Sequence, residues 1–220
     1  MAISFVGAAT GTTSATLPSF NSGDCAVVFA FRDGSTTNPS VPAGWTNLTN
    51  TLDGSTCSVS IGWRRLLVGD TTTGTWTNAS IIAVQVYRGC EPFIAPFLLG
   101  GTAQGTVNTS VAMQTFTLNR TNATSWVAGF VGHRSVDTDL NTAWTGMTSR
   151  QNPVNATAEM ASQDTNGAVS SWSTQTRSIG GTASGWISYT IEVRALQAQT
   201  PGELILPPFA PMKHNRDHRS

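Results

Sequence analysis

Few residues of the kinds that carry catalysis or bind metals stand close together in this sequence. His133 is the only histidine before residue 214, and it ends an apolar run that is followed by Asp137 and Asp139. An imidazole beside carboxylates could relay a proton or hold a metal, but a zinc site needs three or four ligands. A DTD sequence without a longer series of oxygen ligands is weak evidence for calcium. We therefore expect a histidine at the end of a strand beside solvated carboxylates, and no metal or other cofactor.

Carboxylates are the other candidates for chemistry. Two of them facing one sugar could hydrolyse a glycoside, if residues distant in the sequence converged in space: Asp24, Asp33, Asp53, Asp70, Glu91 and Glu159. Nothing in their spacing indicates that they converge. The motifs HExxH, GxSxG, GxxxxGKS/T and GxGxxG of common hydrolases and nucleotide-binding proteins do not occur. The sequence therefore predicts that the protein is not an enzyme.

The three cysteines, Cys25, Cys57 and Cys90, include no CxxC pair. An odd number of cysteines cannot form a closed disulfide framework, so we expect three partly buried thiols. A disulfide between Cys25 and Cys57 stays open as an alternative if their strands are neighbours.

Charge and hydropathy bear on the partners of the chain. Twelve basic residues balance twelve acidic ones, so no net field attracts nucleic acid or an anionic membrane. No apolar stretch of 18 residues occurs and the N-terminus lacks the pattern of a signal peptide, so we expect a chain that stays in the cytoplasm and does not enter a membrane. Only 11% of the residues are charged, whereas Thr and Ser occupy 55 of 220 positions, which predicts a surface rich in hydroxyls.

The elements that must position these residues are nearly all strands. Residues 57–65 and 186–194 alternate apolar and polar side chains, as expected of strands with one solvent-facing side. Residues 25–31 and 81–86 are apolar on both sides, which predicts strands in the middle of the structure. Clusters of turn-forming residues separate the strands. Further strands are expected at 3–8, 111–118, 126–133, 157–163 and 170–176.

The two halves of the chain share a pattern. Apolar runs end in arginine at positions 32 and 134 and again at 88 and 194, and the GWT at Trp45 corresponds to the AWT at Trp144. We predict one domain over residues 1–196 made of two related Greek-key halves, 1–94 and 95–196. Two such halves facing each other make an all-β, jelly-roll-like antiparallel sandwich. Trp45 and Trp144 are then equivalent core residues, or alternatively platforms on which a sugar could stack.

A Pro-rich segment, residues 197–220, follows the last strand. Its prolines favour an extended chain, because proline fixes φ and lacks a backbone donor. We interpret it as a docking arm that binds a neighbouring subunit; a disordered tail is the alternative. The residues expected to make the contact are Leu204, Ile205, Leu206, Pro207, Pro208, Phe209, Arg216 and Arg219.

Two stretches, FRDGSTTNPSVPAGWTNLT and IGWRRLLVGDTTTGTWTNASIIAVQVYRG, carry a resemblance to a known group of proteins. Their R-D-G-S turn, P-x-G-W turn and G-T-W-T-N strand entry are similar to those of phage and prophage virion proteins. The resemblance covers residues 1–95, and residues 96–196 only through the duplication. It implies a structural role in a virion, as a head-decoration protein or a tail or fibre component.

From these observations we expect a virion structural protein. A capsid decoration or cement protein that docks through its arm onto the major capsid protein or a tail component comes first, and a homo-oligomer such as a trimer is the expected assembly. The alternative is a tail-fibre module that recognises host-surface glycan. Neither function involves nucleic acid or a membrane.

Overall fold

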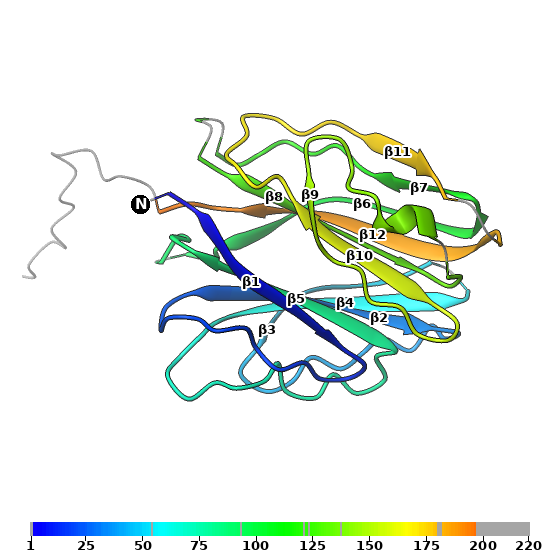
Figure 1. Ribbon diagram of the computed structural model, residues 1–220, viewed down its shortest axis with the longest axis horizontal. Coiled ribbons are helices and arrows are strands. Elements are labelled where there is room, and N and C mark those ends of the chain that lie inside the picture. The colour runs from blue at the N-terminus through cyan, green and yellow to red at the C-terminus, as the bar shows by residue number, and fades with distance from the viewer. Residues whose placement is uncertain are drawn as a thin grey trace, which may run out of the picture.

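The computed structural model contains two five-stranded antiparallel sheets packed face to face, and a two-stranded ribbon lies outside the second sheet (Figure 1). It describes residues 2–53, 55–92, 94–120, 122, 124–136, 138–179 and 182–196. In spatial order the first sheet contains β1 (Ser4–Gly11), β5 (Ile81–Arg88), β2 (Cys25–Asp33), β4 (Cys57–Arg65) and β3 (Thr46–Leu52). The second contains β6 (Phe97–Asn108), β12 (Ser184–Val193), β8 (Trp126–His133), β10 (Glu159–Asp164) and β9 (Thr148–Gln151). The predicted all-β antiparallel sandwich is confirmed.

Each sheet is built from one half of the chain. The first sheet uses residues 4–88 and the second uses residues 97–193, and both have the same strand order. Within each sheet only one pair of neighbours is consecutive along these strands, β3 with β4 and β9 with β10. A Greek key needs three consecutive strands joined by hairpins. The strand order therefore does not confirm the Greek-key and jelly-roll detail of the prediction.

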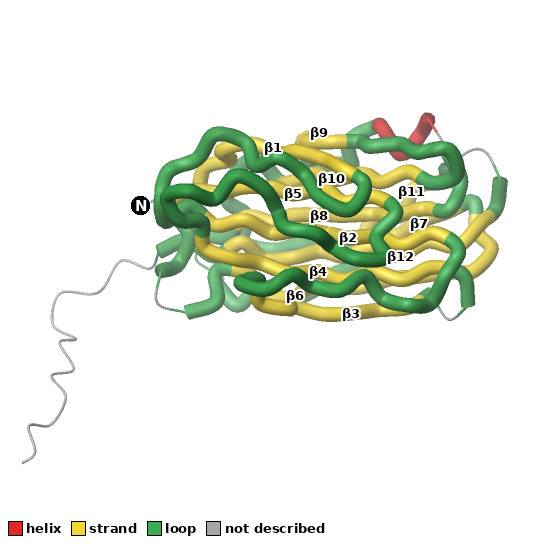
Figure 2. Tube along the Cα trace, turned by 90° about the horizontal axis from the view of Figure 1, so that it is seen from below, coloured by secondary structure: helices red, strands yellow, loops and turns green. Residues whose placement is uncertain are grey.

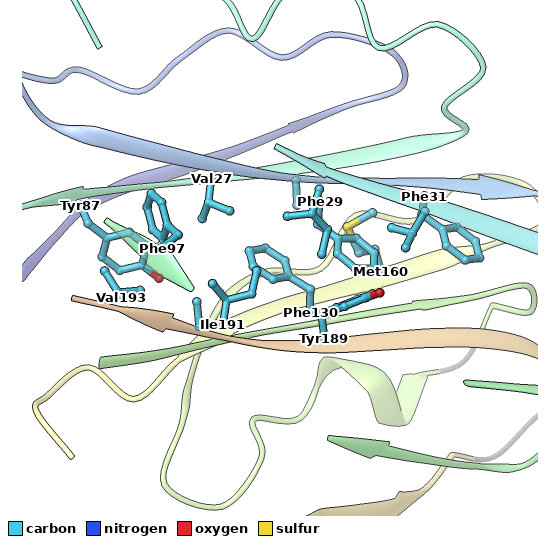
Figure 3. Close-up of a cluster of buried hydrophobic side chains, with 14 of the residues drawn as sticks. Val27, Phe29, Phe31, Tyr87, Phe97, Phe130, Met160, Tyr189, Ile191 and Val193 are labelled. Carbon is cyan, nitrogen blue, oxygen red and sulfur yellow. The ribbon is translucent and has the colours of Figure 1, made fainter. Parts of the chain in front are cut away.

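The alternating side chains of the strands form the central core. In β2, Val27, Phe29 and Phe31 point between the sheets, whereas Val28 points to the outer face. Figure 3 shows these inner side chains meeting those of the second sheet. The rings of Phe29 and Phe130 stack with centroids 5.3 Å apart. Each large apolar side chain buried here stabilises the fold by roughly 1.5–3 kcal/mol.

Both sheets are also covered on their outer faces. Loops cross the outer face of the first sheet, as Figure 2 shows, and enclose a second apolar cluster around Trp76. On the second sheet, Val111 and Met113 of β7 (Ser110–Met113) cover Val127 and Val131. β7 pairs with β11 (Gln175–Ser178), and the 3-10 turn η1 (Thr138–Asn141) contributes Leu140 to the same outer layer. The apolar character of β2 and β5 on both sides follows from this arrangement.

The polar sides of two strands are buried, although alternation predicted that they face solvent. Ser58 and Ser60 of β4 are fully buried, and their hydroxyls donate to carbonyls of a covering loop at 3.0 and 2.6 Å. In β12, the hydroxyl of Thr190 donates to the carbonyl of Gln114 at 3.2 Å. A hydroxyl on a sheet can satisfy a loop carbonyl that would otherwise lose its hydrogen bond on burial. Many of the hydroxyls expected on the surface therefore hold loops to sheets.

A polar network crosses between the sheets. Arg150 donates two hydrogen bonds to the fully buried Asp164, at 2.9 and 2.7 Å, and its guanidinium lies 3.8 Å from the ring centre of Phe5. The hydroxyl of Tyr87 donates to Asp164 at 3.0 Å. Burial and then the charge of Asp164 raise the pKa of Tyr87 well above its usual value. These bonds fix the position of β5 relative to β10.

Several strands differ from the sequence-based expectation. β6 was not predicted, because Gly100 and Gly101 weaken a strand pattern. Both glycines are needed, since a Cβ at Gly101 would lie 2.6 Å from Cβ of Gln114, and one at Gly100 would enter the ring of Phe116. The strands expected at 111–118 and 170–176 are shorter or displaced, Ser110–Met113 and Gln175–Ser178. Across the described part of the chain, no helical segment could cross a bilayer.

Candidate docking groove

A groove lies at one end of the sandwich, between the end of β4 and the segment that joins β5 to β6. It encloses about 600 Å³. Its lining combines apolar and cationic side chains, among them Trp63, Arg64, Arg65, Leu67, Pro92 and Ile94. The two stretches meet here because β4 and β5 are both neighbours of β2, so that residues 65 and 87 pair with Cys25 on its two sides.

The apolar side chains at this groove are unusually exposed. Leu67 is 56% exposed, Ile94 is 52% exposed, and the adjacent Val68 is 90% exposed. A single exposed apolar residue is normal, but a contiguous group marks an interaction surface. The groove is therefore a surface on which a partner with apolar side chains would gain free energy by excluding water.

Trp63 forms a rigid part of the groove. It lies on the inner side of β4, packs against the central core, and its ring centre is 6.4 Å from that of Phe97. It is also the only tryptophan that is not buried, and all seven lie in the described part of the chain. The alternating pattern assigned Trp63 to the core, and the sequence analysis did not predict that Leu67 and Val68, which follow β4, are exposed.

The two arginines of the groove differ in their partners. Arg64 pairs with Asp70 at 3.0 Å and lies 5.8 Å from the ring centre of Trp45. Arg65 donates to the backbone carbonyls of Gly23 and Glu91, at 3.0 and 2.7 Å. No described carboxylate forms an ion pair with Arg65. The groove therefore carries one positive charge that no described carboxylate neutralises directly.

The chain leaves the sandwich beside this groove. The amide of Leu196 donates to the carbonyl of Gly89 at 3.1 Å, and the amide of Glu91 donates to the carbonyl of Arg194 at 2.8 Å. The side chain of Glu91 is buried and pairs with Arg120 at 2.7 Å. Burial, and then the nearby charge of Arg120, lower the pKa of Arg194. The start of the β5–β6 segment and the last described residues are thus held together.

The docking residues predicted from the sequence, Leu204 to Phe209 with Arg216 and Arg219, all lie outside the described residues. What the structure adds is a surface of matching chemistry near the point from which they continue.

Trp45 and Trp144, the sugar platforms considered from the sequence, are 8% and 3% exposed. Trp45 packs edge-on against Trp76 with ring centres 5.7 Å apart. Trp144 borders a smaller hollow of about 280 Å³, where the guanidinium of Arg177 lies 5.1 Å from its ring centre. Both rings are core residues, so neither offers an open face to a sugar.

Some of the residues considered for catalysis lie near one another: Glu159 pairs with His133 across β10 and β8, and Asp33 pairs with Arg134, the residue after His133. His133 ends β8 as expected but is fully buried, with Nδ1 2.9 Å from the carbonyl oxygen of Ser135. Asp24 forms two hydrogen bonds with Arg88, and Asp33 pairs with Arg134 at 2.6 Å. Within the described ranges no three His, Cys, Asp or Glu residues are grouped so that they could hold a metal.

The alternative of a disulfide between Cys25 and Cys57 is wrong. β2 and β4 are neighbours, but Cys25 pairs with Arg65 and Cys57 with Asp33, so the two cysteines lie at opposite ends of the paired strands. All three thiols are free and buried. A hydrogen bond from Cys90 lowers the pKa of Cys25, whereas burial and then the charge of Asp53 raise the pKa of Cys57.

Comparison of the chain with protein families, with curated proteins and with solved structures found no match to any of them.

Proposed function

We propose that this chain is a structural protein of a virion, a capsid decoration or cement protein that docks on neighbouring subunits through residues 197–220. One observation supports docking most strongly: an exposed apolar groove lies beside the place where the chain leaves a sandwich whose own core is filled. The virion assignment depends on the resemblance of residues 1–95. Other virion proteins, the major capsid protein or a tail component, are the proposed partners, together with further copies of this chain.

Recognition of a host glycan by a tail-fibre module is the second candidate. It is favoured by the partly exposed Trp63 with Arg65 next to it, because an aromatic face beside a hydrogen-bond donor is suited to a sugar. The exposed Leu67 and Ile94 in the same groove fit an apolar peptide better than a sugar. We therefore place the structural role first.

The two candidates differ in what the chain binds. As a decoration protein, the tagged full-length chain should sediment with virions assembled in its presence, in a fixed ratio to the major capsid protein, and a chain ending at residue 196 should not. A glycan-recognition module should instead bind an immobilised glycan, with or without residues 197–220, and lose that binding in Trp63→Ala. Sedimentation of both chains in equal amounts would contradict docking through the arm.

A further inference from the structure

We propose that the groove at Trp63 is the acceptor for residues Leu204–Phe209 of a second copy of this chain, so that copies exchange arms. This inference rests on the proposed function, since it names the surface on which the arm docks between like subunits. It adds a receptor site within the sandwich, which the resemblance to virion proteins does not identify.

The length of the segment allows the contact. The last described residue, Leu196, is bonded to Gly89, and the groove lining begins three residues further along the chain, at Pro92. Seven residues, 197–203, separate Leu196 from the apolar run. Fully extended they span about 23 Å, enough to reach a groove on an adjacent molecule whose own exit point lies nearby.

The chemistry of the segment matches the lining of the groove. The sequence ELILPPFAP presents Leu204, Leu206 and Phe209 among prolines. Pro-rich segments bind grooves lined by aromatic side chains, because their extended conformation is preformed and little entropy is lost on binding. Trp63 supplies the aromatic surface, and Ile94 supplies exposed apolar area.

The charges also match. Glu203 stands directly before the apolar run, and it is one of two acidic residues after residue 196. Arg65 has no carboxylate partner among the described residues, because it donates only to backbone carbonyls. A carboxylate placed beside it would form a charge-assisted hydrogen bond and set the direction of the bound segment.

A second copy is favoured over the same molecule by the proposed function, in which the arm joins one subunit to its neighbour. The prolines of the arm restrict φ, so little entropy is lost when the segment binds between subunits. Each copy has one arm and one groove. Exchange in a closed ring would therefore fill every groove, as cyclic oligomers require.

A matched pair of full-length variants tests the groove. Ile94 and Val154 are both 52% exposed, so they make a matched pair. Ile94 lines the groove, whereas Val154 does not and lies beside Glu159, which pairs with His133 at the end of β8. Ile94→Glu should raise the dissociation constant of the oligomer roughly tenfold or more, as should Phe209→Glu in the arm, whereas Val154→Glu should leave it unchanged. Sedimentation velocity measures this, and circular dichroism checks that each variant is folded.

Crosslinking tests which copy supplies the arm. Ile94→Cys and Phe209→Cys are made in separate chains and mixed, and the three native thiols are buried, so the wild-type chain serves as the blank. A bismaleimide should link one chain of each kind. Crosslinks formed only within a chain carrying both substitutions would overturn exchange between copies. Loss of assembly on deleting residues 197–220, without any effect of Ile94→Glu, would refute the groove and leave the proposed function standing; assembly without residues 197–220 would contradict both.

Discussion

The spacing between the two sheets depends on a position where only glycine fits, and this makes a sharp prediction. A Cβ at Gly132 in β8 would lie 2.6 Å from Cγ and 2.9 Å from Cε2 of Phe31, and closer still to Cδ2. Phe31 is fully buried in the opposite sheet, so the ring cannot rotate into solvent. Overpacking of this kind costs about 1–3 kcal/mol. The higher strand stability of alanine offsets roughly 0.5–1 kcal/mol of it. Because the added Cβ lies this close to three ring atoms, the overpacking falls in the upper part of that range, about 2–3 kcal/mol, and we expect Gly132→Ala to destabilise the protein by about 1–2.5 kcal/mol.

Gly129, three residues earlier in β8, provides the control. It faces the outer layer, where an added Cβ would lie 2.7 Å from Sδ of Met113 and 3.0 Å from Cε of Met147. Flexible thioether side chains can move aside, so Gly129→Ala should change the stability by less than about 0.5 kcal/mol. Urea unfolding followed by tryptophan fluorescence gives both free energies. A Gly132→Ala protein as stable as the wild type, or less affected than Gly129→Ala, would refute the close packing of the sheets.

Three further perturbations follow from the buried charges and turns. Arg150→Met leaves the carboxylate of Asp164 buried without its cation, so it should lower the free energy of unfolding by about 3–5 kcal/mol. Thermal or chemical unfolding measures this loss. Arg64→Met, which breaks a less buried pair, should cost less than about 1 kcal/mol. Burial alone would raise the pKa of Asp53. Hydrogen bonds from the Cys57, Thr56 and Ser55 amides and from the Thr56 hydroxyl together lower it by more, so the pKa lies below its usual value of 3.8. The stability that this carboxylate contributes is present above pH 3.8 and is lost as the pH falls through its folded pKa, so unfolding titrations from pH 5 to 2 should show a smaller loss in Asp53→Asn.

The sequence was sufficient for the strands whose side chains alternate or are apolar throughout. β2, β5 and β8 lie where the pattern placed them, because a strand face that is buried consists of apolar residues and can be recognised from the sequence. The pattern was insufficient for β6, where two glycines make room for Gln114 and Phe116. Close approach of a distant segment leaves no periodic signal, so such a strand resembles a loop.

The candidate groove was harder to predict for a related reason. Alternation correctly placed Trp63 on the core side of its strand, but its partial exposure depends on how the segment at Pro92 and Ile94 passes the end of β4. Likewise, Ser58 and Ser60 have the residue type of a solvent-facing side, and only the covering loop buries them. Tertiary covering by loops is set by contacts far apart in the sequence, and a local pattern does not contain it.

We propose that the sandwich folds without residues 197–220 and that those residues join copies together. Sedimentation velocity over a range of concentrations, applied to the full chain and to a chain ending at residue 196, tests both parts of this proposal. We predict an oligomer for the full chain, and a monomer with an unchanged unfolding midpoint for the shorter one. The same number of copies in the assemblies of the two chains, or a shorter chain that does not fold, would contradict this proposal.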